Sequence, residues 1–473
     1  MNGLILTAVF VGAIWCAVFV LRAPLLLAAM AAVIIGAGFG YPFMTFTVAS
    51  THWTLDRVLL PLLIAAFLVQ RQQGVTAPKP WGWSEWLLAA FLAWLSVSLL
   101  AHDFRATFAD TATPVWRWFT AYAIPILLYT IARQSSYGRR EINWIHGGLA
   151  LFGVYLAVTG ICEILHWWWL VFPKHIADPT VGLHFGRARG PMVTAVSYGL
   201  YLGTSFLCLW MVRERLGKLR WLVLPPLVAL EVTALYYSYT RSCWMGAGLG
   251  TLLVLGLSLR GRTRIVALTS LVLGASVLLA AKMDSIVALR REQTAQVAES
   301  SAEARLSFAY VSWEMFKDSP VWGVGFGQFP TAKMPYLADR VDLPLADLRM
   351  LVHHNTFLSL LTETGIVGLG LFVALLAAWG RHAWRLHRDA LAPPWARRQA
   401  VLFLGVLGLY VCQLMFHELS YSTIDNCLVF VLAGATTGIG PAWSTAAASA
   451  RAAEPEPVFA PTAGYTGYRL VPR

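Results

Sequence analysis

Three stretches of the sequence contain residues that could bind an anion and transfer a proton. Arg241 lies in SYTRSCWMG between two apolar runs, and Arg305 lies in a more polar stretch further along the chain. The pair His353 and His354 comes directly before Asn355. Arginine binds phosphate oxygens through paired hydrogen bonds and keeps its charge, whereas histidine exchanges a proton near neutral pH. This combination predicts a site for an anionic substrate with a histidine as general base.

Each of these residues also has an ordinary structural explanation. An arginine at membrane depth usually marks a site, but the side chain of Arg241 could instead extend to the membrane surface. Arg305 could be a solvated surface residue. Two neighbouring histidines followed by a helix cap and spaced glycines are harder to explain in this way. At this point either histidine could be the base, and the family resemblance described below prefers His354 with His353 as the second choice.

The residue types after the two histidines predict the local structure. Asn355 can cap a helix over 356–364, and Gly365 can end this helix in a left-handed turn. Gly368 and Gly370 would allow close packing in the apolar segment that follows. The capped helix is too short to cross a membrane, so we expect it to lie at the membrane interface.

A second helix is predicted around Arg305. Ser300 and Glu303 have the spacing of a capping box, which would place Arg305 in the first turn. Leu306 and Trp313 belong to an apolar stripe at helical spacing. The sequence DSP ends the helix, and GVGFGQF follows as a Gly-rich turn. For this segment a plain tight turn is favoured over a phosphate cradle.

The composition places all these elements in a membrane protein. Hydrophobic residues make up 58% of the 473 residues and charged residues 13%, and the mean hydropathy is +0.62. A soluble domain has about 25% charged residues, so an ordinary soluble enzyme, a disordered protein and a disulfide scaffold are excluded. The six cysteines form no CxxC pair and are expected to be small buried hydrophobic residues rather than metal ligands.

The apolar runs predict an all-α integral membrane protein with about 12–13 transmembrane helices. A crossing helix needs about 20 apolar residues. The candidate spans are 3–20, 24–40, 58–70, 85–101, 115–132, 145–163, 192–211, 220–237, 243–259, 265–281, 366–380, 399–416 and 425–440. The first is interpreted as a retained span rather than a cleaved signal peptide, and the third is the weakest.

The positive charges predict the orientation. Alternate connections hold 21 of the 36 Lys and Arg residues, and these connections are expected in the cytoplasm. The N-terminus is then outside and the C-terminus inside, although an even number of spans with the N-terminus inside remains open. The expected organisation is an N-terminal bundle over 1–281 with an outer loop at 164–191, a periplasmic catalytic loop at 282–365, C-terminal helices over 366–440, and a disordered cytoplasmic tail at 441–473.

The motif around His354 resembles a known family. His354-Asn355, nine residues, Gly365, two residues and Gly368 match the pattern of the bacterial O-antigen ligase family, which also contains O-antigen and exopolysaccharide polymerases. Thr240-Arg241-Ser242 and the stretch around Arg305 resemble further motifs of this family, in the same order. The resemblance is strong over 230–380 and rests on topology alone upstream. The aromatic segment 164–175 and the long tail depart from the pattern.

The resemblance implies a fold, a reaction and site residues. The fold would be GT-C-like, and the enzyme would be a metal-independent inverting glycosyltransferase without cofactors at the periplasmic face of the inner membrane. The donor would be a glycan on a polyprenyl diphosphate such as undecaprenyl diphosphate, for lipopolysaccharide or exopolysaccharide biosynthesis. Arg241 and Arg305 would bind the diphosphate, and His354 would act as base. Further substrate-binding candidates are Arg187, Arg189, His353 and Asn355, and Gly365 and Gly368 complete the structural motif.

The acceptor and the reaction class leave alternatives. A polymerase, working with a flippase and a chain-length regulator, is slightly favoured over a ligase that transfers the glycan to lipid A-core. A transporter of lipid-linked sugars is a more distant alternative, because its charged residues would be expected at the membrane midplane. A membrane scaffold would not explain the Arg and His set. Nothing in the sequence indicates nucleic-acid binding, and the outer loops contain no Asp-x-Asp for a metal-bound nucleotide sugar.

Overall fold

The structure is a computed structural model of the chain. It describes residues 15–439 except 42, 49–50, 107, 109–111, 293–294, 339–342 and 344. The predicted tail at 441–473 lies outside the described residues, and so does most of the predicted first span at 3–20. Residues 15–20 of that span are helical, and this helix continues to residue 22.

The described chain is built almost entirely from helices. The α-helices are α2 (Leu25–Phe39), α3 (Leu55–Gln72), α4 (Trp83–Leu100), α5 (Pro114–Trp118), α6 (Ile124–Gln134), α7 (Arg139–Ile164), α8 (Ala195–Val212), α9 (Arg220–Tyr237), α10 (Arg241–Ser258), α11 (Gly261–Glu292), α12 (Ala295–Asp318), α13 (Phe329–Ala332), α14 (Thr356–Arg388), α15 (Pro394–Leu414) and α16 (Thr423–Thr437). A small antiparallel hairpin pairs β1 (Phe46–Val48) with β2 (Thr51–Trp53). Short helical turns make up the rest of the regular structure; they are η1 (Phe119–Ala123), η2 (Lys174–Ala177), η3 (Gly190–Met192), η4 (Gly217–Leu219), η5 (Met334–Tyr336), η6 (Leu345–Met350) and η7 (Leu419–Tyr421).

Six segments of the described chain are long and apolar enough to cross a membrane. They are α4, α5 to α6, α7, α8, η4 to α9, and α14. The apolar helices α2 and α16 are shorter, with 15 residues each. These findings confirm the predicted class, an all-α integral membrane protein. Helices occupy every predicted span after the first, but the total of 12–13 crossings stays a prediction.

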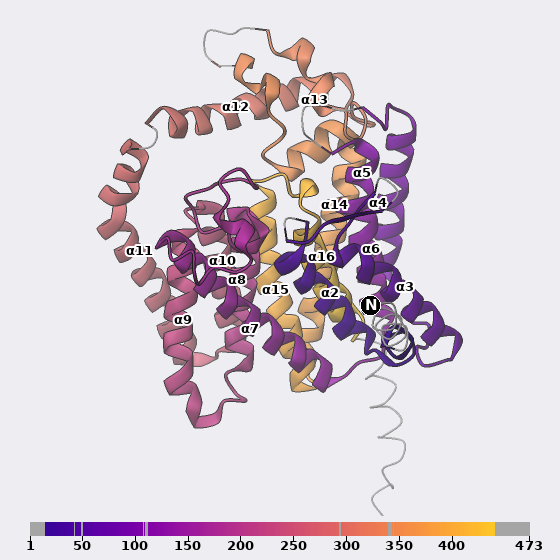
Figure 1. The fold of residues 1–473 in the computed structure, drawn as a ribbon, viewed down its shortest axis with the longest axis vertical. Coiled ribbons are helices and arrows are strands. Elements are labelled where there is room, and N and C mark those ends of the chain that lie inside the picture. Colours follow the sequence, from indigo (N-terminus) through magenta and orange to yellow (C-terminus); the bar gives the residue numbers. More distant parts are fainter. Residues whose placement is uncertain are drawn as a thin grey trace, which may run out of the picture.

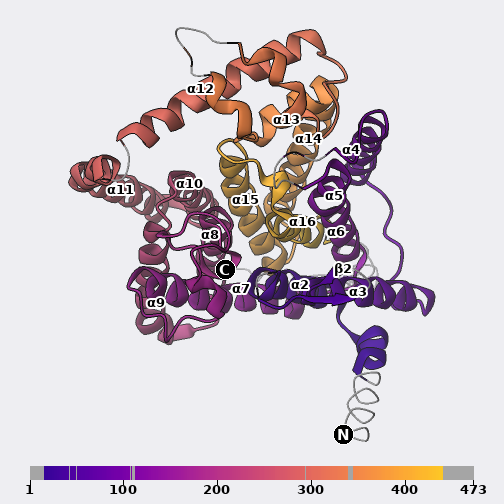
Figure 2. The ribbon, with the colours of Figure 1, turned by 45° about the horizontal axis from the view of Figure 1, so that its top comes forward.

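The helices form two groups joined by a central helix. Helices α7 to α10 pack together on one side, and α4, α6, α14 and α16 pack on the other (Figures 1 and 2). Helix α15 contacts α8 and α10 in the first group and α14 and α16 in the second. Helix α11 leads away from α10, and α12 then crosses above one end of the bundle, where it contacts α14.

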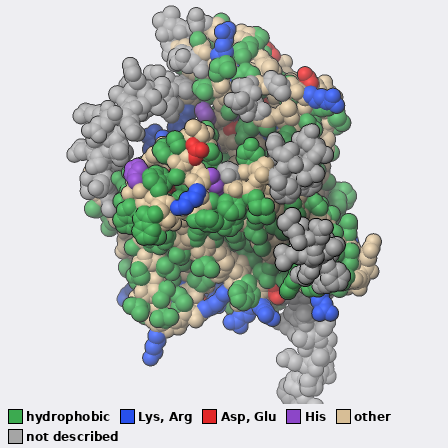
Figure 3. Space-filling view, in the orientation of Figure 1, with side chains coloured by type: hydrophobic (Ala, Val, Ile, Leu, Met, Phe, Trp, Pro, Cys, Tyr) green, Lys and Arg blue, Asp and Glu red, His purple; other side chains and the backbone are tan. Residues whose placement is uncertain are grey.

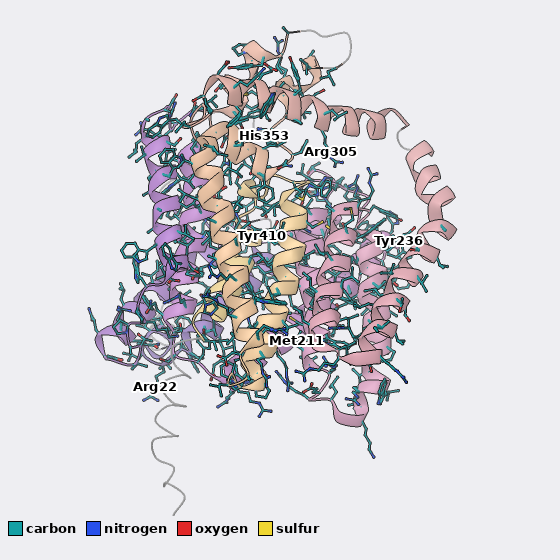
Figure 4. The ribbon with its side chains drawn as sticks, turned by 180° about the vertical axis from the view of Figure 1, so that it is seen from behind. Arg22, Met211, Tyr236, Arg305, His353 and Tyr410 are labelled. Atoms are coloured by element: carbon teal, nitrogen blue, oxygen red, sulfur yellow. The ribbon has the colours of Figure 1, made fainter. Side chains whose placement is uncertain are left out.

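The two ends of the bundle differ in charge and in loop length. Short connections join α6 to α7, α8 to α9, α10 to α11 and α14 to α15 at one end, and these connections together with the helix turns beside them carry many arginines. Figure 3 shows blue side chains along this lower edge, below a broad hydrophobic band. The long loop before α8, helix α12 and the start of α14 lie at the other end, where Figure 4 labels His353 and Arg305. This separation agrees with the predicted charge pattern.

Three local predictions were wrong. Helix α12 begins at Ala295, so Ser300 and Glu303 lie inside it and form no capping box, and Arg305 lies in its third turn. The capping-box spacing is also common within helices, where it has no such meaning. A side chain added at Gly370 would meet no atom within 4 Å, so this glycine provides no close packing. Gly368 does, because a Cβ there would lie 3.2 Å from Cδ1 of Trp94 in α4.

The apolar stripe predicted for α12 is not its buried side. Leu306 is 63% exposed and Trp313 54% exposed, whereas Phe308, Val311 and Met315 are buried. The buried residues pack against Phe329 of α13 and against η6. Both faces of α12 carry apolar residues, so periodicity alone could not decide which one packs. With Phe308, Val311 and Met315 packed in this way, the Arg305 side of α12 faces the bundle.

Candidate active site

The start of α14 is fixed by the cap that the sequence predicted. Asn355 Oδ1 accepts a hydrogen bond from the backbone N–H of Leu358 at 3.0 Å. Its Nδ2 donates to the carbonyl of Met415 at 2.8 Å, and Thr356 Oγ1 donates to the carbonyl of His417 at 2.8 Å. The cap therefore ties the start of α14 to the connection between α15 and α16. Both ends of the Asn355 amide are used within the protein, which makes this residue structural.

The two neighbouring histidines have different surroundings. His353 is 2% exposed, its ring centroid lies 3.6 Å from that of Phe329, and its Nε2 is 3.1 Å from Thr362 Oγ1. His354 is exposed, and its ring meets Phe308 edge to face at 5.3 Å. Only His354 is open to a substrate. The structure therefore favours His354 over His353 for a role in chemistry.

Gly365 bends α14 ten residues after the Asn355 cap. Its φ of 67° and ψ of −170° interrupt the helix at the predicted residue, but this ψ differs from that of the left-handed turn that was predicted. Only glycine adopts such angles readily. A Cβ at this position would lie 2.1 Å from the carbonyl oxygen of Val321. The backbone N–H of Ile366 donates to the Pro320 carbonyl at 2.9 Å. The bend thus creates the space in which the segment after α12 contacts α14.

The Gly-rich turn at 323–327 fills this space and uses its amides for packing. The N–H groups of Val324 and Gly325 donate to the carbonyls of Thr362 and Glu363 at 2.9 and 3.0 Å. The N–H of Phe326 donates to Ser98 Oγ at 2.9 Å. These amides have no capacity left for a phosphate. The segment is a tight turn that positions α14, as the favoured interpretation of the sequence predicted.

Arg241 occupies the first position of α10, directly after a very short connection. Helix α9 ends at Tyr237, and Tyr239 adopts a left-handed φ of 45° before α10 begins. The Arg241 side chain is exposed. In the neighbouring residue, the Oγ of Ser242 lies 2.6 Å from Nε2 of His417. The short connection therefore holds Arg241 beside the same α15–α16 connection that the cap of α14 contacts.

Arg305 and Arg187 reach this place from two other segments. The guanidinium of Arg305 lies 5.7 Å from the ring centroid of Phe416, so its side chain extends from α12 toward the bundle (Figure 4). Desolvation and then repulsion from Arg241 lower the pKa of Arg305. The same two causes, in the same order, lower the pKa of Arg187 in the loop before α8. We call Arg187, Arg241 and Arg305 the arginine cluster.

No carboxylate neutralises the arginine cluster in the described part of the chain. The ion pairs of the described residues involve other arginines, such as Arg117, Arg133 and Arg189. Three cations that repel one another and have no acidic partner favour the binding of an anion. Figure 3 shows blue and purple side chains together at the hollow beneath α12.

Three histidines around the cluster are held in their neutral form. Desolvation and then Arg305 lower the pKa of His354, and Glu418 opposes this shift. Desolvation, Arg305 and His354 lower the pKa of His417 to about 3. The pKa of His184 falls to about 4 through desolvation and then the neighbouring arginines. A neutral imidazole can accept a proton. His354 and His184 are both exposed and neither ring makes a hydrogen bond within the described part of the chain, whereas His417 contacts Ser242. His354 alone of the three lies in the spaced motif with Asn355 and Gly365.

Arg189 does not join the cluster, although it lies two residues from Arg187. It is fully buried, and its Nε lies 3.0 Å from Glu163 Oε1. Its remaining nitrogens donate to the carbonyls of Val181, Ile176 and Asp178. All its donors therefore hold the loop before α8 in shape. The spacing in HFGRARG could not distinguish the two arginines.

Comparison with known proteins supports one family for the part of the chain that holds most of this geometry. Residues 226–373 match the family model described as O-antigen ligase. This region, which is less than half of the chain, is similar to the O-antigen ligase family. The match contains Arg241, Arg305, His354 and the two motif glycines, whereas Arg187 and the α15–α16 connection lie outside it. No curated protein matches the chain.

The O-antigen ligase match over 226–373 supports a membrane enzyme of the ligase or polymerase type. Such enzymes use a lipid-linked glycan and a glycan acceptor. The described residues contain no group of three His, Cys, Asp or Glu arranged to hold a metal ion. Metal independence nevertheless remains a prediction.

The sequence analysis missed a deeply buried charge near the candidate site. Arg117 in α5 is 1% exposed, and its Nη1 lies 2.8 and 2.9 Å from the two carboxylate oxygens of Glu363. Its other nitrogens donate to Ser420 Oγ at 2.6 Å and Ser359 Oγ at 3.1 Å, and Glu418 lies at 3.5 Å. An arginine inside a predicted span was the available signal, but its partner is 246 residues away in the sequence.

Proposed function

We propose that this protein is a glycosyltransferase that elongates a surface polysaccharide at the periplasmic face of the bacterial inner membrane. The donor is a glycan on a polyprenyl diphosphate such as undecaprenyl diphosphate. The observation that carries the proposal is the arginine cluster without acidic partners, which meets a neutral, exposed histidine at one end of a membrane bundle. The family match over 226–373 supports the same class of reaction.

The arginine cluster would bind the diphosphate of the donor. A lipid diphosphate carries its charge at the membrane surface, where hydration is poor and electrostatic attraction is strong. Arg187, Arg241 and Arg305 come from three separate segments, so they can approach phosphate oxygens from three directions. Each guanidinium offers paired donors that match phosphate geometry. The cluster also stabilises the negative charge that grows on the leaving group as the bond to the sugar breaks.

His354 would act as the general base. A hydroxyl oxygen of the acceptor attacks the anomeric carbon of the donor sugar, and its proton moves to the neutral imidazole of His354. The bond between the anomeric carbon and the phosphate oxygen breaks, and the lipid diphosphate leaves with the electron pair. Attack from the face opposite the leaving group inverts the anomeric configuration. No metal ion or cofactor takes part in this scheme.

We assign polymerisation, with ligation to lipid A-core as the alternative. The loop before α8 carries Arg187 and also exposes Trp167, Trp169 and Phe172, which are 49, 78 and 51% exposed. Exposed aromatic faces in the loop that carries Arg187 offer a surface on which sugar rings of a second lipid-linked glycan can pack. The alternative acceptor would bring its own lipid anchor and phosphates.

The test is transfer by the purified protein in lipid vesicles with a lipid-linked repeat unit as donor. One reaction receives the same lipid-linked unit as acceptor, and a parallel reaction receives lipid A-core. We expect longer lipid-linked chains in the first and little product in the second. Product only with lipid A-core would assign the ligase instead. Absence of transfer with both, together with vectorial movement of the intact donor across the vesicle membrane, would indicate a transporter.

A further inference from the structure

A second charged feature lies at the end of the bundle opposite the arginine cluster. An open cavity of about 740 Å³ runs along the outer surface of α7. Its lining extends from Arg139 at the start of this helix to Leu151. Twelve residues of α-helix rise about 18 Å. This length slightly exceeds half of a hydrocarbon core of about 30 Å, so the cavity spans the depth of one membrane leaflet.

The cavity has a cationic end. Arg139 and Arg140 on α7 and Arg215 in the connection between α8 and α9 line it. In the described part of the chain none of these three has an ion-pair partner, since the nearby Glu214 pairs with Arg398 and Arg213 and Glu141 caps the start of α7. Arg215 Nη1 donates to the Asn143 carbonyl at 2.7 Å, which holds its guanidinium beside α7.

The charge at this end is uncompensated. Partial desolvation and then repulsion from Arg398 and Arg139 lower the pKa of Arg215. An anion placed among these side chains would relieve the repulsion. A zwitterionic headgroup would bring a cation of its own to the same place, and so it fits less well.

The rest of the cavity is apolar and shallowly grooved. Trp144 and Leu151 are 62 and 72% exposed and form its walls. Gly147 and Gly148 lie between them, and a Cβ added at either glycine would meet no atom within 4 Å. Glycines that support no close packing in a membrane helix leave a depression in its surface. An acyl chain can lie in such a depression.

We propose that this groove binds an anionic phospholipid, with the phosphate among Arg139, Arg140 and Arg215 and one acyl chain along Gly147 and Gly148. The lipid comes from the leaflet that meets the short basic connections, which the distribution of positive charge places on the cytoplasmic side. The site is separate from glycosyl transfer and does not depend on the proposed function. Each arginine near an anionic lipid contributes several-fold to binding.

The experiment measures lipids that stay bound to the purified full-length protein by native mass spectrometry. Dioleoylphosphatidylglycerol and dioleoylphosphatidylcholine are added in competition, so that only the headgroup differs. We expect at least a fivefold preference for phosphatidylglycerol, because about 1 kcal/mol per arginine corresponds to roughly fivefold. Equal occupancy by the two lipids would overturn the proposal. Soluble glycerophosphoglycerol is added as a third arm, and its displacement of the lipid at similar concentration would identify a site for free anions instead.

Two pairs of variants locate the site. The triple substitution Arg139→Gln, Arg140→Gln and Arg215→Gln should abolish the preference. Arg260→Gln, Arg262→Gln and Arg264→Gln remove the same charge at the same end, where all three side chains are exposed, and should preserve it. Equal loss of the preference for phosphatidylglycerol in both triple variants would show that the basic surface attracts anionic lipids in general. This result would overturn the proposal.

The second pair fills the groove without changing charge. Gly148→Leu should reduce bound phosphatidylglycerol several-fold while leaving the fold intact, since the added side chain has open space. Gly256→Leu in α10 is the matched control, because a Cβ at Gly256 also meets nothing within 4 Å. Unchanged binding of phosphatidylglycerol to Gly148→Leu would show that no acyl chain lies along Gly147 and Gly148. This result would overturn the proposal that the groove binds a phospholipid.

Discussion

The buried Arg117 and the three residues of the arginine cluster illustrate opposite uses of charge. Arg117 is buried, makes two short contacts with Glu363 and also contacts hydroxyl groups. The arginine cluster is at least partly exposed, and its three members have no ion-pair partner in the described residues. A buried cation is stable only when its partners are built into the fold. Unpaired cations at a surface instead favour an anionic ligand, so pairing separates structural arginines from candidate binding residues.

The largest effect is expected for Arg117→Leu. Removing one partner of a buried ion pair leaves Glu363 charged without compensation, which typically costs about 3–5 kcal/mol. The same pair joins α5 to α14 and to the connection before α16. We therefore expect loss of folded protein, measured by thermal unfolding in detergent and by the monodisperse fraction in gel filtration.

The matched variants for Arg117 sharpen the comparison. Arg117→Leu combined with Glu363→Leu removes the two charges in closest contact and should recover part of the stability, because replacement of a buried pair by apolar residues is often neutral. Glu418, which lies 3.5 Å from Arg117 in the wild type, keeps its charge in this variant. Arg241→Leu should leave thermal unfolding nearly unchanged, since surface substitutions usually change stability by about 0.5 kcal/mol or less. A destabilising Arg241→Leu equal to Arg117→Leu would remove the distinction between the two groups.

His354→Ala is expected to have the next largest effect, on activity rather than stability. A positioned base contributes about 10²–10⁴-fold to the rate, so glycan transfer should fall by that amount at unchanged protein yield. His353→Ala is the control. Because His353 is buried against Phe329, its loss should lower the unfolding temperature but leave more activity per folded molecule. Equal loss of activity in the two variants, or full activity of His354→Ala, would contradict the role of His354 as base.

The neighbourhood of His354 was largely predictable from sequence, whereas that of Arg117 was not. The Asn355 cap and the bend at Gly365 depend on residues adjacent in the chain, and the positions of both were predicted correctly. The partner of Arg117 and the packed face of α12 depend on contacts with distant segments, which one sequence does not reveal. Arg187 and Arg189 show the same limit, since their different burial follows from the position of Glu163 in α7.

Substitutions in the arginine cluster should have a smaller effect. Arg241→Ala and Arg305→Ala each remove hydrogen bonds to a charged group, worth about 1.5–3 kcal/mol, which corresponds to roughly 10- to 150-fold in transfer. Lysine at either position should recover only part of this loss, because an ammonium group lacks the paired donors of a guanidinium. Initial rates at several donor concentrations provide the measurement.

Arg349→Ala is the control for the arginine cluster, since Arg349 is also an exposed arginine, in η6. This variant should transfer glycan at the normal rate. Normal rates for Arg241→Ala and Arg305→Ala at normal expression would exclude the proposed binding of the diphosphate.

The smallest expected effect is a shift in the pH dependence of glycan transfer. Arg305 and Glu418, the charged neighbours of His354, should shift it in opposite directions. Desolvation and Arg305 lower the pKa of His354, whereas Glu418 raises it. The neutral form is the base, so transfer should be lost only as the pH falls through a pKa below the ordinary value of about 6.5. The acid limb of kcat/KM reports this pKa in the free enzyme.

Changing the two neighbours should move that limb in opposite directions. Arg305→Gln removes a positive charge, stabilises the imidazolium and should shift the acid limb of kcat/KM to higher pH. Glu418→Gln removes a negative charge and should shift it to lower pH. The bound diphosphate should itself raise the pKa of His354, so the limb of kcat in the wild-type protein should lie above that of kcat/KM. Rate measurements between pH 5 and 8 in vesicles test all three shifts, and two shifts of the same sign in Arg305→Gln and Glu418→Gln would show that another group titrates.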